Sequence, residues 1–240
     1  MSRAWCLLLL AAACARGGQP AGDAAGDDQQ CTDPVTYFAD GDGDMHGDAT
    51  RPMPACTQPP GTVMVGDDCD DRDANRAPGL TELCDGIDND CDEATVEQCP
   101  ATCQPVRRPP PDDQHVYLFC GANQNWPTAS ATCASAMFTL AQIDDAAENA
   151  FIRATATQLF GAQNINFGAN DRAAEDRWVW EDGTQFWQGR SGGQAVGGRF
   201  VNWSGGEPND DSGEDCGEMV GDGRWNDHEC GDGRKFVCRR

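Results

Sequence analysis

The chain has 240 residues, a formal net charge of -23 and 14 cysteines, which leaves room for one or two domains besides any targeting segment. Its negative charge argues against a nucleic-acid partner, because binding to phosphates requires a basic patch, and it disfavours anionic membrane surfaces for the same reason. The carboxylates are clustered with Gly and Asn, so we expect cations to be their partners.

Residues 1–13 are typical of an export signal. They contain Arg3, an apolar run and three alanines before Cys14, and they are too short to span a membrane. The Leu-Ala-Ala-Ala-Cys sequence resembles a bacterial lipoprotein cleavage site, which favours lipidation of Cys14 over plain secretion. Residues 14–30 are rich in Gly, Ala, Asp and Gln, which predicts a flexible tether. We therefore expect an outer-surface lipoprotein or a secreted protein that meets a membrane only through an N-terminal lipid anchor.

Cysteine usage indicates a disulfide framework. Cys6 is lost with the signal and Cys14 is lipidated or lost, which leaves an even number of cysteines in an exported chain. Such a set predicts up to about six bridges and no free thiol for catalysis.

Residues 31–100 form an acidic module with few large apolar side chains. The module carries 17 Asp and Glu residues but only three Arg residues, so burial of hydrocarbon cannot hold it together unaided. Six cysteines can supply bridges, in a pairing that the sequence does not rank: Cys31, Cys56, Cys69, Cys84, Cys91 and Cys99.

Three acidic clusters in this module predict metal sites. Asp residues alternate with Gly in the first cluster, as in a calcium loop, although the EF-hand pattern with its closing Glu is absent. The other two clusters surround cysteines and resemble the metal-binding repeats of bacterial surface proteins and, more distantly, thrombospondin type 3 repeats. Adjacent carboxylates repel one another without a cation, so we expect metal binding and folding to be coupled; the alternative is a solvated spacer. The candidate ligands are Asp40, Asp42, Asp44, Asp48, Asp68, Asp70, Asp73, Asp88 and Asp90.

Residues 101–112, which include a Pro-rich stretch, are expected to be a linker, and residues 113–240 a second domain. A first strand is expected at 115–120. Pro127 is suited to the first turn of a helix that extends through Met137. A capping box of Asp145 and Glu148 predicts a second helix that reaches Leu159. We expect the apolar residues of these elements, and those of a strand at 178–180, to form the core.

The C-terminal segment carries the strongest functional signal. Several of its polar side chains offer only oxygen ligands, which Ca²⁺ prefers. The peptide bond before Pro208 can adopt the cis form at low cost, and a cis bond would aim the side-chain carbonyl groups on either side of Pro208 at one ion. These candidate ligands are Glu207, Asn209, Glu214, Asn226 and Asp227. The Glu-Pro-Asn and Trp-Asn-Asp sequences, with the cysteines around them, resemble the sugar site of a C-type lectin domain.

This resemblance covers the chain from about residue 103. It implies an α+β fold with two helices, small antiparallel sheets and a long calcium-binding loop region, here placed after a disulfide-rich, mostly irregular acidic module. It also implies disulfides between Cys133 and Cys238, between Cys216 and Cys230, and between Cys103 and Cys120. An auxiliary calcium site is implied at Asp171, Glu175, Asp210 and Asp215, although the strand at 167–170 and the loop after Asn209 depart from the usual pattern.

The functional expectation is calcium-dependent carbohydrate binding without catalysis, with a glycan or glycoconjugate as partner. In the family, the Glu-Pro-Asn order goes with mannose, fucose or N-acetylglucosamine. One alternative keeps the fold and the calcium but binds a protein, ice or mineral surface. An enzyme, either a paired-carboxylate hydrolase or a zinc protein, is disfavoured because there are only three histidines and the carboxylates are better explained as ligands. His228 is expected at the surface beside a disulfide, or in contact with a sugar.

Overall fold

The computed structural model describes residues 32–109 and 115–240. The expected signal, tether and lipidation site, together with Cys31, lie outside these residues. No helix in the described ranges is both long enough and apolar enough to cross a membrane.

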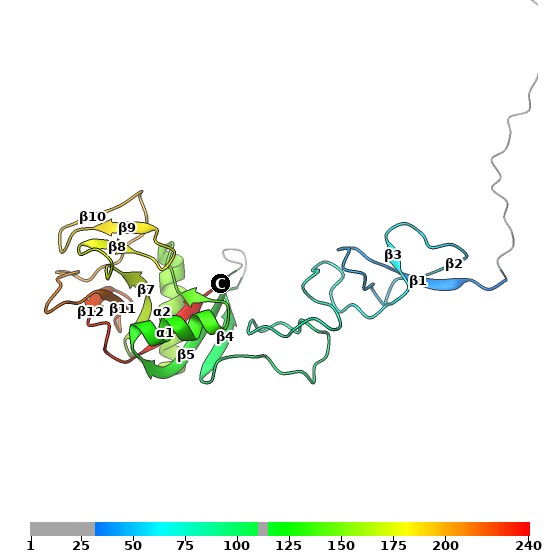
Figure 1. The fold of residues 1–240 in the computed structure, drawn as a ribbon, viewed down its shortest axis with the longest axis horizontal. Coiled ribbons are helices and arrows are strands. Elements are labelled where there is room, and N and C mark those ends of the chain that lie inside the picture. The colour runs from blue at the N-terminus through cyan, green and yellow to red at the C-terminus, as the bar shows by residue number, and fades with distance from the viewer. Residues whose placement is uncertain (1–31, 110–114) are drawn as a thin grey trace, which may run out of the picture.

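The N-terminal module has little regular structure (Figure 1). A three-stranded antiparallel sheet has the order β2-β1-β3, formed by β1 (Val35–Ala39), β2 (Pro52–Ala55) and β3 (Thr62–Val63). The chain then follows loops and turns as far as residue 102. Two disulfides fix these loops, one between Cys69 and Cys91 and one between Cys84 and Cys99. The expectation of a disulfide-rich, mostly irregular module is confirmed.

The C-terminal domain is built on a larger sheet of ten strands. The last strand, β13, lies between β5 and β7 in this sheet. It pairs antiparallel with β5, near the start of the domain, and parallel with β7. Residues 103–107, which we placed in the linker, form a strand that pairs with the next one along the chain. The strands are β4 (Cys103–Arg107), β5 (Val116–Gln124), β6 (Thr139–Leu140), β7 (Ile165–Asn170), β8 (Arg177–Val179), β9 (Gln185–Gln188), β10 (Gln194–Ala195), β11 (Cys216–Met219), β12 (Trp225–His228) and β13 (Arg234–Arg239).

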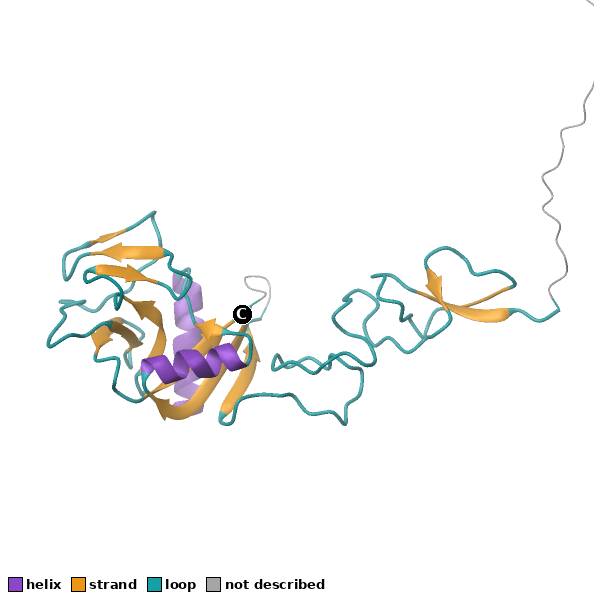
Figure 2. Cartoon of the chain, in the orientation of Figure 1, coloured by secondary structure: helices purple, strands orange, loops and turns teal. Residues whose placement is uncertain are grey.

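Both predicted helices are present (Figure 2). Helix α1 (Trp126–Ser135) begins after Asn125, whose side chain accepts a hydrogen bond from the backbone N–H of Thr128. Helix α2 (Ala146–Phe160) begins after Asp145, whose carboxylate accepts from the backbone N–H of Glu148. These are the N-cap interactions that satisfy free donors of a first turn.

Two apolar residues that we expected in the core are exposed. Met137 lies beyond the end of α1 with a φ of 63° and is 63% exposed. Leu159, in the last turn of α2, is 36% exposed. Helix α1 ends at Ser135, before Met137, and Leu159 lies on the solvent side of the last turn of α2.

An aromatic core holds the loop region against the sheet. Trp225 is fully buried and packs on Phe167, Trp180 and Phe186. Its indole N–H donates to the Asn149 side chain of α2 at 2.8 Å. Strand β12 is therefore positioned by packing at Trp225.

Three disulfides reinforce this domain. Cys133 of α1 is joined to Cys238 of β13, and Cys103 of β4 to Cys120 of β5. Cys216, at the start of β11, is joined to Cys230, just after β12. The last bridge closes one end of the β11–β12 pair, next to the long loop.

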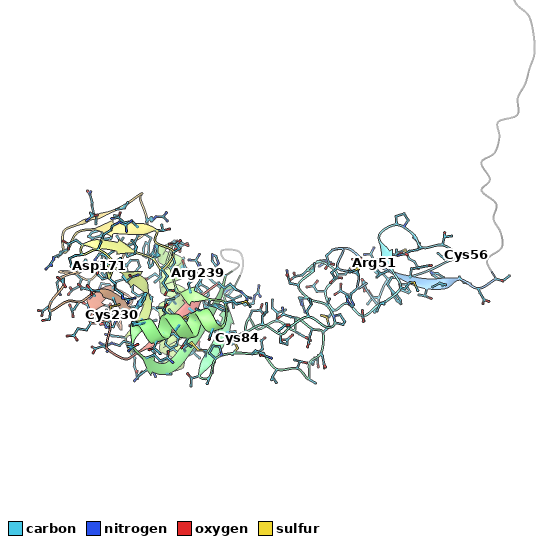
Figure 3. The ribbon with its side chains drawn as sticks, in the orientation of Figure 1. Arg51, Cys56, Cys84, Asp171, Cys230 and Arg239 are labelled. Atoms are coloured by element: carbon cyan, nitrogen blue, oxygen red, sulfur yellow. A yellow bond between two sulfur atoms is a disulfide. The ribbon has the colours of Figure 1, made fainter. Side chains whose placement is uncertain are left out.

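The last turns of the module touch the second domain. Cys84 belongs to the same buried cluster as Val116 and Phe138, and Figure 3 shows it beside that domain. Arg240 donates to the carboxylate of Asp85 at 2.8 Å and lies over the ring of Phe138.

Candidate functional site

The long loop between β10 and β11 is tied to β12 by backbone hydrogen bonds. The N–H of Ser204 donates to the carbonyl of Trp225, and the N–H of Trp225 donates to the carbonyl of Asn202. The peptide bond between Glu207 and Pro208 is cis. Because Trp225 is fixed in the core, these bonds bring the loop at 204–215 next to Asp227.

The carboxylates of Glu207 and Glu214 lie close enough to Asp227 for its charge to act on both of them. Asp227 is fully buried. Its Oδ2 accepts the backbone N–H of Asp210 at 2.7 Å, whereas its Oδ1 has no hydrogen-bond partner among the described residues. Buried polar atoms are nearly always paired, so this oxygen is a candidate ligand atom for a cation.

The acidity of the neighbouring groups is consistent with crowded negative charge. Burial, with the repulsion of Asp227, raises the pKa of Glu214 to about 7. The pKa of Glu207 is also raised, by burial and by its contact with Asp227. A cation between the three groups would relieve this repulsion.

The donor atoms fit calcium. Every group here is a carboxylate or an amide, and Ca²⁺ takes oxygen ligands in flexible numbers. Asn209 is exposed at the rim. Its amide nitrogen donates to a Glu207 carboxylate oxygen, and its Oδ1 accepts the N–H of Asp211 at 2.8 Å. The arrangement thus has a buried floor at Asp227 and an exposed polar rim at Asn209.

Asn226 directly precedes Asp227 in β12, and its amide nitrogen donates to groups outside the three carboxylates. Its Nδ2 donates to the Asp227 carbonyl and, at 3.3 Å, to the carboxylate of Glu218. Glu218 is 4% exposed and also accepts from Asn164 and Arg234. The sequence analysis did not single out Glu218, because an acid within a four-residue strand gives no sign that it is buried.

The four residues expected at an auxiliary site also lie together. Carboxylate oxygens of Glu175, Asp210 and Asp215 lie within 4.8 Å of one another. Asp171 is 3% exposed, and Figure 3 labels it on the same part of the domain as Cys230. Its Oδ2 accepts the N–H of Asp176 at 2.9 Å, its Oδ1 has no partner among the described residues, and burial, with the repulsion of Glu175, raises its pKa to about 7. Arg190, whose guanidinium lies among these acids, was not predicted because no local pattern marks it.

In the N-terminal module, the first acidic cluster folds against the second. Carboxylate oxygens of Asp40, Asp42 and Asp44 lie within 4.8 Å of one another. One oxygen each of Asp42, Asp44 and Asp68 is inaccessible to solvent and has no partner in the described ranges. Burial raises the pKa of Asp42 and of Asp68, and nearby acids, Asp71 among them, add to it.

Other candidate ligands in the module are engaged locally. Asp48 accepts from Thr50, Asp73 accepts from Asn75, and Asp70 forms an ion pair with Arg76 at 2.7 Å. These contacts are typical of turns. Asp48, Asp70 and Asp73 are therefore weaker candidates for a metal than the residues that face the interior.

The third cluster gathers around an acid that the sequence analysis omitted. Carboxylate oxygens of Glu82, Asp88 and Asp90 lie within 4.8 Å of one another. Glu82 is 5% exposed, and its Oε1 accepts the backbone N–H groups of Asn89 and Asp90. Its place between Thr81 and Leu83 carries no local signal for a ligand.

Comparison with known proteins agrees with this geometry. The family model "Lectin C-type domain" matches residues 122–240. Perlucin from Haliotis laevigata is 31% identical over 128 residues, which are 52% of this chain and 75% of perlucin. The chain belongs to the C-type lectin family. The model "Putative metal-binding motif" matches residues 68–97, so the lectin domain follows a metal-binding motif, as the sequence predicted.

Two further kinds of comparison match a similar share of the chain. Collectin-10 from Xenopus tropicalis is 32% identical over 127 residues, and the chain spans 42% of its length. Among solved structures, the carbohydrate-recognition domain of cow CD23, determined with a GlcNAc2Man3 oligosaccharide, is 26% identical with a TM-score of 0.46, over 59% of this chain and 95% of that one. The mouse scavenger receptor C-type lectin domain is 24% identical with a TM-score of 0.47, over the same shares.

Proposed function

We propose that this C-type lectin is an exported, calcium-dependent carbohydrate-binding protein without catalytic activity. The observation that carries the proposal is the proximity of Glu207 and Glu214 to Asp227, whose buried Oδ1 has no hydrogen-bond partner in the part of the chain that the structure describes. Calcium held there would bind two adjacent hydroxyls of a sugar. Asn209 and Asn226 complete the proposed ligand set.

The protein's own groups would orient the sugar. Asn209 is exposed and Glu207 is partly exposed, so each can present a second polar atom to a ligand hydroxyl from the solvent side. The Glu-Pro-Asn order at 207–209 favours mannose, fucose or N-acetylglucosamine. A site that grips one or two hydroxyls has an affinity of about 1 mM, or about -4 kcal/mol. Useful binding therefore requires clustering on a surface.

A column of immobilised mannose tests this function. The full chain should be retained in calcium, should elute with free mannose, and should pass unretained in EDTA. Retention that EDTA leaves unchanged would contradict the calcium-dependent site. Calcium-dependent binding to a protein or mineral surface that free mannose does not compete would favour the adhesion alternative.

A double variant supplies the matched control. Glu207→Gln with Asn209→Asp keeps the number of oxygen ligands and the total charge but exchanges the two polar groups at the rim. We expect retention to move from mannose to galactose while calcium affinity changes little. Unchanged retention on mannose would contradict the assignment of these two residues.

For the module at 31–100 we propose calcium as a structural staple, held by Asp40, Asp42, Asp44 and Asp68 and, in the matched motif, by Asp88 and Asp90 with Glu82. Few apolar side chains of the module are buried, Tyr37 and Ala39 among them. Apolar packing therefore contributes little to holding these carboxylates together. A cation would hold the loops together and stiffen the segment.

Trypsin digestion measures this stiffening. Cleavage after Arg76 should be about tenfold slower in calcium than in EDTA, because an opened module exposes its backbone to the protease. The double variant Asp42→Asn with Asp68→Asn should lose most of that protection, whereas Asp33→Asn, an exposed acid outside the clusters, should keep it. Equal cleavage in calcium and EDTA would favour a solvated spacer.

We also propose the domain order that the sequence indicated: a signal at 1–13, a tether at 14–30 with Cys14 as lipid anchor, the metal-binding module, a linker within 101–112, and the lectin domain. Strand β4, which begins at Cys103, makes the lectin sheet start inside that linker.

A further inference from the structure

Arg190 lies in the turn after β9, and its guanidinium faces the auxiliary cluster of acids. It contacts the carboxylates of Asp210 at 2.5 Å, Asp176 at 3.3 Å and Glu175 at 3.7 Å. It also donates to the carbonyl of Asn209 at 3.4 Å. A single positive side chain therefore contacts two of the four residues expected to bind an auxiliary calcium, Glu175 and Asp210.

The backbone around Arg190 joins the same segments. The N–H of Gly189 donates to the carbonyl of Asp176 at 2.7 Å, and the N–H of Ser191 donates to the carbonyl of Pro208 at 2.6 Å. The turn at 189–191 thus bridges the loop after β7 and the long loop that carries the sugar site. These bonds place the guanidinium between both loops.

We propose that Arg190 is a built-in counter-ion of the auxiliary site, which holds the long loop in the calcium-free protein and competes with a second calcium ion. Competition follows from charge, because the Asp210 oxygen that a cation would use already binds the guanidinium, and two positive groups at that distance repel each other. Its competition with calcium rests on the proposed function of the lectin domain; its hold on the loop does not.

Asp210 connects this contact to the principal site. Its backbone N–H donates to Oδ2 of Asp227 at 2.7 Å, and its Oδ1 accepts the N–H of Glu214 at 3.1 Å. Fixing Asp210 therefore restrains the carboxylate of Asp227 and the backbone of Glu214. With Arg190 in place, the principal site keeps its arrangement without a second ion.

Arg190 can also move away. Its side chain is 49% exposed, and ion pairs at such exposure are weak enough to exchange with solvent. The second calcium would then bind with reduced affinity, because each binding event must first displace the guanidinium.

The test compares Arg190→Gln with Arg199→Gln in the full chain. Both variants lose one positive charge. Arg199 lies in the long loop between β10 and β11, is exposed, and forms no ion pair with any residue that the structure describes. In calorimetric titration with calcium, one binding event should become about tenfold tighter in Arg190→Gln, while the events at the principal site and in the N-terminal module change much less. Hydrogen exchange in EDTA should be faster at the amides of Asp210 and Glu214 in Arg190→Gln alone.

The two readouts separate this inference from the proposed function. If Arg190→Gln matches Arg199→Gln in calcium titration and in amide exchange, Arg190 is an ordinary surface residue and the inference is wrong. If neither the wild type nor either variant binds calcium, the proposed function and the proposed competition between Arg190 and calcium are both wrong. Amide exchange in EDTA then still decides whether Arg190 holds the loop. Arg190→Lys, which keeps the charge, should restore part of the wild-type behaviour.

Discussion

Replacing Asp227 with Asn should lower the affinity for calcium by at least about 100-fold and abolish retention on mannose. The substitution preserves shape but removes one charge from the proposed ligand set and puts an amide where a buried carboxylate oxygen has no partner among the described residues. Calorimetric titration with calcium measures the first effect and the mannose column the second.

The same variant distinguishes a ligand from a structural residue. In EDTA, Asp227→Asn removes the repulsion that raises the pKa of Glu207 and Glu214, so its melting temperature should equal or exceed that of the wild type. Glu229→Gln, an exposed acid just past β12, is the control and should change neither property. A variant that melts lower in EDTA yet still binds calcium at wild-type affinity would show that Asp227 serves the fold alone.

Acidity should act in opposite directions on the calcium-free and calcium-loaded protein. In the folded state the pKa of Glu214 and of Asp171 is raised to about 7, well above the ordinary carboxyl values of 4.5 and 3.8. A raised carboxyl pKa means that the folded state binds more protons than the unfolded state between the two values, so the free energy of unfolding decreases as pH rises through this window. In EDTA the melting temperature should therefore increase when the pH falls from 7.5 to 5.

In calcium the balance reverses, because the ion must displace those protons. The dissociation constant should rise by about tenfold for each pH unit below 7 at each site. The difference in melting temperature between calcium and EDTA should thus be large at pH 7.5 and almost absent at pH 5. Parallel melting curves at both pH values would contradict a carboxylate cage.

Local signals in the sequence were sufficient for the helices. Asn125 and Asp145 cap their helices in the structure through hydrogen bonds to residues three positions later, and such interactions depend only on neighbours in the chain. The family followed from the Glu-Pro-Asn and Trp-Asn-Asp sequences, and the metal-binding motif and the irregular character of the module followed from short sequences that contain Gly, Asp and Cys. The exposure of Met137 and Leu159 was not predicted, because it depends on how far each helix is covered by the rest of the domain.

Burial of polar groups could not be predicted in the same way. His228, which we expected at the surface or against a sugar, is 3% exposed, and neither ring nitrogen has a hydrogen-bond partner among the described residues. Burial lowers the pKa of its imidazole. Its neighbours include β11, which pairs with β12 and places Cys216 opposite His228, and the residues adjacent to His228 in sequence do not reveal this burial.

The sequence by itself determined which atoms are available: oxygen donors in the C-terminal loops, paired cysteines and glycine-spaced aspartates. These properties belong to residue types and short spacings, so they can be read without a fold. Only the tertiary structure decided which acids face one another, which are satisfied by turns, and that Arg190, Glu82 and Glu218 lie among them. Packing around Trp225 brings together segments that are tens of residues apart in the chain. Electrostatic partners depend on the distance between groups in space, which short sequence patterns do not reveal.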